Sequence, residues 1–337
     1  MKKILLASTA LVGFAGAAAA EISLSGYAEI GIFGGSGPNA NSATAETETQ
    51  FHSDWQVDFR FSNTTDGGVE FGGRVQIEET NGADAINGGL RIDEESFWVS
   101  GAFGKVTLGE TDGAFDWALS EIYSGSSLQD DHTTHAGAYW NTGLDGAYDD
   151  QIMRYEYSFG DFAVAISAEM DDDENAGTAF DGVTDDASFG IGGKWSGNLS
   201  GVDVGAGVAY QDNGTNSVWG LSGSAAFSNG IVVAAGYADL DGTNDGVGNG
   251  VAVDSWWGID LSYTPPTMSA LTIGVNYGEY EASSSLDGNP SGWGIVANYD
   301  LGGGAVAMAG YGASDGADRF GNEYGSGNGN GTETFSV

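Results

Sequence analysis

The residue types that most often carry catalysis are scarce in this chain. Its 337 residues include no cysteine and three histidines: His52, His132 and His135. The last two form the stretch HTTH and could contact a metal ion, but HTTH lacks the helical spacing and the glutamate of a metalloprotease HExxH motif. No GxSxG stretch marks a nucleophilic serine. We therefore expect no catalytic residue, no defined metal site and no enzymatic activity.

Carboxylates, in contrast, are abundant. The chain has 48 Asp and Glu against nine Lys and Arg, and loss of the two lysines of a cleaved leader would leave seven bases and a formal net charge of −41. Nucleic-acid binding is not expected, because phosphate contacts need clustered Lys and Arg. The segments DGTNDGVGNG and DDDENAGTAFDGVTDD match calcium loops only loosely. Solvated acidic loops, or cross-bridging of lipopolysaccharide through divalent ions, fit them better than a defined site, so we expect no cofactor beyond loosely bound Ca²⁺.

Five of the few basic residues have one feature in common: they fall on or beside the polar phase of segments in which apolar and polar residues alternate. They are Arg60, Arg74, Lys105, Arg154 and Lys194. Two registers are favoured for the hairpin at 54–79. Asp58 would oppose Arg74 in one, and Arg60 would oppose Glu70 in the other. A register with Arg60 opposite Arg74 is disfavoured, because like charges directly opposite each other destabilise a strand pair. These bases either form a basic wall or merely neutralise nearby carboxylates, and both roles stay open.

Alternation of apolar and polar residues defines the segments that carry these charges. Residues 54–79 show it clearly, with Trp55, Val57, Phe59 and Phe61 apolar and their neighbours polar, then a break at NTTDGG and a second alternating run. This pattern predicts two strands and a turn. Fifteen such runs follow one another from Glu21 onward, and TETFSV at the end starts a sixteenth. The run AVAMAGYG is ambiguous: either Val306 and Met308, or Ala307, Ala309 and Tyr311, belong to its apolar face.

The connections between runs alternate between short turns and long polar loops, among them residues 34–53 and 79–93. Aromatic residues gather near strand ends in phase with the apolar face, for example Phe159, Trp195, Tyr263 and Tyr299. Both features are typical of outer-membrane barrels with aromatic girdles. A soluble sandwich also alternates, but it does not need its aromatics at strand ends. The pattern favours an all-β transmembrane antiparallel barrel.

The first 20 residues, MKKILLASTALVGFAGAAAA, are typical of a secretory signal peptide. Two lysines precede an apolar run, and small residues before Glu21 suit a cleavage site. A membrane anchor is less favoured, because the apolar run is shorter than the ~20 residues of a spanning helix. No change of composition indicates a second domain. We expect residues 21–337 to form one barrel.

Several motifs resemble those of general diffusion porins from Gram-negative outer membranes, particularly those of purple alphaproteobacteria. They are EISLSGYAEIGI, TTDGGVEFGGRVQ, FWVSGAFGKVTLGET, RYEYSFGDFAVAIS and NYDLGGGAVAMAGYG, spread over residues 21–337. The resemblance implies sixteen strands, a homotrimer in contact with outer-membrane lipid and lipopolysaccharide, and a long third loop folded into the pore. Such porins end in a complete strand with a terminal aromatic residue, whereas this sequence stops at TETFSV, so its last strand is expected to be incomplete.

Residues 112–148 take the place of that third loop. Six acids in it could supply the negative side of a pore constriction: Asp112, Asp116, Glu121, Asp130, Asp131 and Asp145. The five bases named above would form the opposite, basic side. The alternative is a solvated acidic loop on the surface.

The function implied is a water-filled channel for passive diffusion of ions and small hydrophilic solutes. The large negative charge predicts weak cation preference, because a pore lined by one sign of charge concentrates counter-ions. Two alternatives differ from this: a solute-selective channel of the same architecture, and a calcium-binding acidic β-protein of the cell surface.

Overall fold

The computed structural model describes residues 21–36, 49–79, 90–123, 127–128, 135–139, 141, 143–145, 151–170, 187–243, 253–282, 289–315 and 332–337. Sixteen strands and one short helix occur in these ranges. The strands are β1 (Glu21–Ser36), β2 (Gln50–Thr64), β3 (Glu70–Glu79), β4 (Leu90–Gly101), β5 (Gly104–Glu110), β6 (Gln151–Phe159), β7 (Phe162–Glu169), β8 (Ser188–Leu199), β9 (Val202–Asp212), β10 (Ser217–Phe227), β11 (Ile231–Thr243), β12 (Val253–Tyr263), β13 (Leu271–Ala282), β14 (Ser291–Gly302), β15 (Ala305–Asp315) and β16 (Thr332–Ser336). The helix α1 (Ala114–Ala118) follows β5. None of the described helices is long and apolar enough to cross a membrane.

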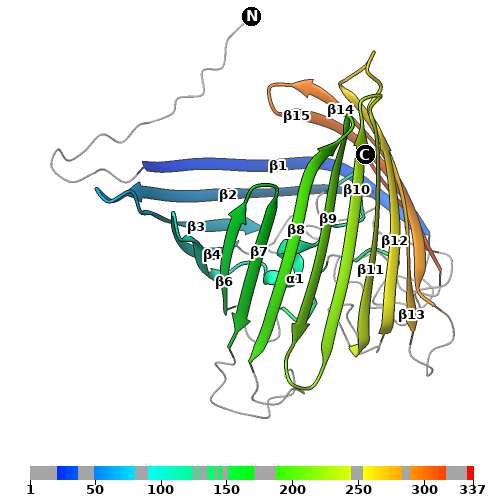
Figure 1. The fold of residues 1–337 in the computed structure, drawn as a ribbon. Helices are drawn as coiled ribbons and strands as arrows, with labels where there is room; N and C mark the ends of the chain where they lie inside the picture. Colours follow the sequence, from blue (N-terminus) through cyan, green and yellow to red (C-terminus); the bar gives the residue numbers. More distant parts are fainter. Residues whose placement is uncertain are drawn as a thin grey trace, which may run out of the picture.

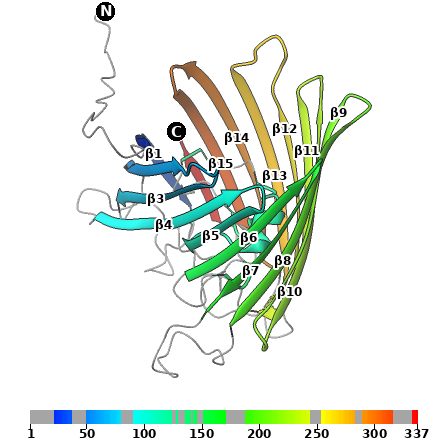
Figure 2. The same ribbon diagram turned by 60° about the vertical axis from the view of Figure 1, so that its left-hand side comes forward.

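Each strand pairs antiparallel with its neighbours in sequence, and β1 pairs with β16, so the sheet closes into a barrel (Figures 1 and 2). The closing contact joins Phe33–Ser36 of β1 to β16, and the backbones of Ile32 and Val337 exchange two hydrogen bonds of 2.9 Å. The predicted sixteen-stranded antiparallel barrel is confirmed.

The outer face of the barrel is apolar. Large exposed side chains recur at every second residue, including Phe59, Phe97, Leu108, Ile166, Ile191, Leu221, Ile259 and Ile295. Tyr311 of β15 lies beside Ile295, and Ala309 lies beside Ala297, which places Ala307, Ala309 and Tyr311 on this face and settles the ambiguous phase of that strand. An apolar band of this kind suits a barrel whose outside meets hydrocarbon.

Both registers predicted for the hairpin at 54–79 are wrong, and the disfavoured one is present. In the β2–β3 hairpin Arg60 lies opposite Arg74, Asp58 opposite Gln76, and Glu70 opposite Thr64. The turn at 65–69 fixes this register through hydrogen bonds between Thr65 and Val69, including backbone N to O at 2.8 Å. Repulsion between the two arginines is offset diagonally, because Asp58 lies 2.5 Å from Arg74 Nε and 4.0 Å from Arg60 Nη2.

A β-bulge interrupts the β3–β4 pair. Residues 90–93, expected to belong to a long connection, are part of β4. Asp93 pairs with Gln76 and Ser96 pairs with Arg74, so that two residues, Glu94 and Glu95, lie opposite Val75 alone. Glu94 has φ of +52°, in the left-handed region. That conformation costs a non-glycine residue about 1–2 kcal/mol.

Candidate functional site

The long segment after β5 is anchored to the inner face of the barrel along its described part. Ala114 N donates to Ser167 Oγ of β7 at 2.8 Å, and Ser120 N donates to Ser222 Oγ of β10 at 2.9 Å. Leu144 N donates to Gln211 Oε1 of β9 at 2.7 Å. The three acceptors alternate with exposed apolar residues of their strands and are buried. The segment therefore contacts the side of the wall that faces away from the apolar exterior.

A second set of contacts fixes residues 135–139 to later strands. Trp256 Nε1 of β12 donates to Gly137 O, and the Tyr280 hydroxyl of β13 donates to Ala138 O, both at 2.8 Å. His135 Nε2 lies 2.5 Å from Asn276 Oδ1. Burial lowers the pKa of His135 to about 4, although the bond to Asn276 opposes the shift. His135 is therefore neutral at pH 7 and acts as an anchor.

An apolar cluster fills the space between this segment and the wall. Phe115, Leu119, Ile122 and Tyr139 of the segment pack with Val218, Leu240, Trp256 and Tyr280 of the strands. The ring of Tyr139 lies 5.2 Å from that of Trp256, centroid to centroid. Full burial of side chains of this size contributes about 1.5–3 kcal/mol each. This cluster helps to hold the segment against the wall.

Glycine lets the helix α1 approach the sheet backbone closely. A Cβ atom added at Gly207 of β9 would lie 2.1 Å from Ala118 O, and one at Gly192 of β8 would lie 2.2 Å from Ala114 O. Figure 1 shows α1 beside β8 and β9, within the ring of strands. Any larger residue at these two positions would push the helix away from the wall.

The predicted acids are brought together in part. Asp112, Asp116, Glu121 and Asp145 influence one another electrostatically, whereas Asp130 and Asp131 lie outside the described residues. Burial, and then repulsion from the other three acids, raises the pKa of Asp116 to about 8. Burial also raises the pKa of Asp145 to about 6, against hydrogen bonds from Gly113 N and Gln211. Burial and Asp112 raise the pKa of Glu121.

The predicted bases lie on the inner face of β2–β8. Each contacts either a carboxylate or a backbone carbonyl oxygen, and only Arg154 and Lys194 contact the segment itself. Arg154 lies 3.7 Å from Asp112 Oδ2 and 3.6 Å from Glu156 Oε2. Lys105 Nζ lies 3.5 Å from Glu156 Oε1. Lys194 Nζ donates to Trp117 O at 2.7 Å and lies 3.8 Å from the centroid of the indole ring. Arg154 and Lys194 therefore connect the wall to the segment.

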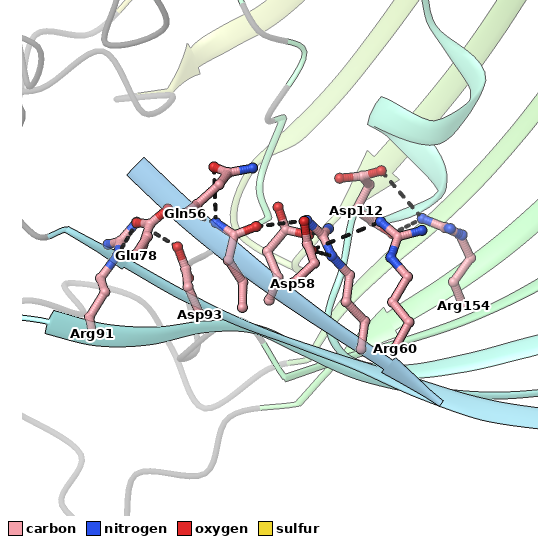
Figure 3. A network of polar contacts seen from close by, with 11 residues as sticks. Gln56, Asp58, Arg60, Glu78, Arg91, Asp93, Asp112 and Arg154 are labelled. Carbon is pink, nitrogen blue, oxygen red and sulfur yellow. Dashed lines mark hydrogen bonds and ion pairs between the residues drawn. The ribbon is translucent and has the colours of Figure 1, made fainter. Parts of the chain in front are cut away.

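Figure 3 shows charged side chains of both signs along β2–β4, with Asp112 and Arg154 next to them. Arg74 Nε donates to Asp58 Oδ1 at 2.5 Å, and its Nη1 forms an ion pair with Glu94. Further along, Arg91 lies between Glu78 at 2.5 Å and Asp93 at 2.6 Å. The sequence prediction missed Arg91, Asp93 and Glu94. The run of three acids at 93–95 was the one available signal, because it breaks the alternation of β4.

Metal and catalytic chemistry have little support in the described ranges. No group of three or more His, Asp or Glu residues there is arranged to hold a metal ion. His132, the partner of His135 in the HTTH stretch, lies outside these ranges. The arrangement instead offers an inner surface with one apolar, covered side and one charged side.

Comparison with known proteins agrees with this geometry. The family model of Gram-negative porins matches residues 7–319. A porin of Rhodobacter capsulatus is 32% identical over 151 residues, which span 44% of this chain and 44% of that relative.

Solved structures share the fold. A triple mutant of Rhodopseudomonas blastica porin superimposes with a TM-score of 0.64 at 20% identity, covering 94% of this chain and 98% of that chain. A second mutant of the same porin gives a TM-score of 0.64 at 19% identity, with the same coverage of both chains.

Proposed function

This chain belongs to the family of Gram-negative porins, and on that premise we propose that it conducts ions and small hydrophilic solutes by passive diffusion, with weak preference for cations. The chain is an outer-membrane β-barrel and not an enzyme. The observation that carries the proposal is the division of the inner face. The described part of the segment after β5 contacts the wall from β7 to β15, and the charged residues of β2–β6 stand on the other side.

We assign the constriction to the gap between that segment and the charged wall. Asp112, Asp116, Glu121 and Asp145 supply its acidic side, and Arg154 pairs with Asp112 at the point where the segment leaves β5. Asp130 and Asp131 stay predictions for the same side. Arg60, Arg74 and Lys105 complete the opposing wall, whereas Lys194 lies on β8 beneath the segment and contacts Trp117. Hydrated charges line a path for water and small polar solutes and disfavour apolar ones, because desolvating those charges is costly.

Cation preference follows from the balance of these charges. The sequence carries 48 acids and nine bases, and the contacts above neutralise most of the bases of the wall. Each paired base contributes little field in the channel, so the surplus carboxylates set the sign. A channel lined by surplus negative charge raises the local concentration of cations.

The test is the reversal potential of the purified protein in a planar bilayer under a gradient of KCl. We expect stepwise conductance increments and a reversal potential of the sign that marks cation preference. Conductance with anion preference would overturn the selectivity, and the absence of conductance by correctly folded protein would overturn the channel itself.

We also propose a homotrimer whose subunits meet through part of the apolar exterior, in contact with outer-membrane lipid and lipopolysaccharide. The exposed apolar side chains of the strands support a partner or lipid on that face. Electrophoresis without heating should show a band at three times the mass of the heated chain. A band of monomer mass in both samples, with cross-linking giving no trimer, would contradict the proposal.

A further inference from the structure

The row of charges on β2–β4 contains one carboxylate whose backbone is held in an unusual conformation. We propose that Glu94 determines the ion selectivity of the wall by inserting a negative charge beside Arg74. This inference rests on the proposed channel function and adds a residue of β4, outside the long segment, to the groups that set its selectivity.

The first support is geometric. At the bulge Asp93 pairs with Gln76 and Ser96 pairs with Arg74, so both keep the inward phase although they are three residues apart. Glu94 has φ of +52°, and its carboxylate forms an ion pair with Arg74 Nη1. Bulges of this kind re-aim a side chain near functional sites. The bulge therefore adds one carboxylate to the inner face that regular alternation would not provide.

The second support is the arrangement around Arg74. Its Nε donates to Asp58 at 2.5 Å, and its Nη2 donates to Gln76 Oε1 at 2.7 Å. Glu94 takes the remaining nitrogen, so all three nitrogens of the guanidinium group have acceptors. Arg60, directly opposite, keeps 54% of its side chain exposed. Without Glu94, Arg60 and Arg74 would share the single carboxylate of Asp58 as their acidic partner.

The third support is the sign of the net charge of the paired residues on β2–β4. The bases are Arg60, Arg74 and Arg91, and the acids are Asp58, Glu78, Asp93 and Glu94. Four acids against three bases leave one negative charge, and removal of Glu94 leaves equal numbers. The carboxylate of Glu94 is itself 43% exposed, so ions in the channel can reach its field. Among these paired residues, Glu94 therefore supplies the one negative charge in excess.

Glu94→Gln tests the proposal, because it removes the charge and keeps the size of the side chain. The matched control is Glu95→Gln, which removes the same charge from the adjacent residue of the same bulge; among the described residues Glu95 forms no ion pair with a base. Reversal potentials are measured in planar bilayers under a KCl gradient for wild type and both variants. We expect Glu94→Gln to lower the ratio of cation to anion permeability about two-fold, and Glu95→Gln to change it much less.

A second variant protects the test against a folding defect. Glu94→Gly also removes the charge, and glycine adopts positive φ freely, so the bulge should be retained. Heat-modifiable migration in electrophoresis reports the folded barrel of each variant. An unchanged permeability ratio in folded, conducting Glu94→Gln or Glu94→Gly overturns the proposal, as does an equal shift in Glu95→Gln. Failure of the wild type to conduct would instead refute the proposed channel function.

Discussion

The two halves of the inner wall obey the same alternation but carry different chemistry. On β7–β13 small, amide-bearing and aromatic inward residues, such as Gly207, Gln211 and Trp256, receive the backbone of the long segment, and the charged Lys194 also binds it. On β2–β6 the inward residues are charged and pair with one another, as Arg74 does with Asp58. The choice of every second residue thus divides the wall into a half that anchors the segment and a charged half, which is the conducting half of the proposed channel.

The largest effect is expected from removing the largest buried side chain of the anchoring half, Trp256. Trp256→Ala deletes an indole that is 2% exposed and the donor to Gly137 O. Truncation of a buried Trp costs about 3–5 kcal/mol. We expect the segment to detach in part, giving larger and noisier single-channel currents and a lower temperature of unfolding. Trp257→Ala, on the exposed outer face of the same strand, is the control and should leave the currents unchanged.

A smaller effect is expected from Gly207→Ala. Its Cβ would lie 2.1 Å from Ala118 O, so α1 must shift, and overpacking of this kind costs about 1–3 kcal/mol. Gly223→Ala is the matched control on β10, because its Cβ meets no atom nearer than 3.8 Å. Thermal unfolding and single-channel conductance should change for the first variant alone. Equal behaviour of the two would show that α1 does not rest on β9.

The smallest expected effect comes from pH. Asp116, with a pKa of about 8, is mostly protonated at pH 7 and gains its negative charge as the pH rises through 8. We expect the preference for cations to increase by about two-fold between pH 7 and pH 9, since one charge is added near the path. Asp116→Asn should lose this increase. A wild-type profile that stays flat across this range would place Asp116 away from the path of the ions.

Much of the division into an anchoring and a charged half could be predicted from the sequence, because the alternation of apolar and polar residues indicates which face of the sheet each side chain lies on. The inward phase of Arg60, Arg74 and Arg154, and the outward phase of Phe59, follow from period two alone. Alternation does not indicate which residue of the neighbouring strand lies opposite a given residue. The turn at 65–69 set Arg60 against Arg74, and only the diagonal contact with Asp58 makes that pairing acceptable.

The anchors of the long segment and the role of Glu94 could not be predicted for a related reason. Gln211 and Trp256 lie 67 and 119 residues from the segment atoms they bind, and no local pattern links such distant positions. The bulge at 93–95 breaks the alternation, so the first residues of β4 were assigned to a loop. Where the alternation is interrupted, the inward-facing residues cannot be identified from the sequence pattern.

The central claim is that water and ions pass along the charged half and not along the covered half. A chain without cysteine allows a direct test with two single substitutions, Ser96→Cys on β4 beside Arg74 and Ser222→Cys on β10 beneath Ser120. Both replace an inward serine, and a charged methanethiosulfonate reagent is added during current recording. We expect rapid modification of the introduced thiol and partial block of the current for Ser96→Cys, and no modification or block for Ser222→Cys. Equal or faster block at Ser222→Cys would contradict the central claim.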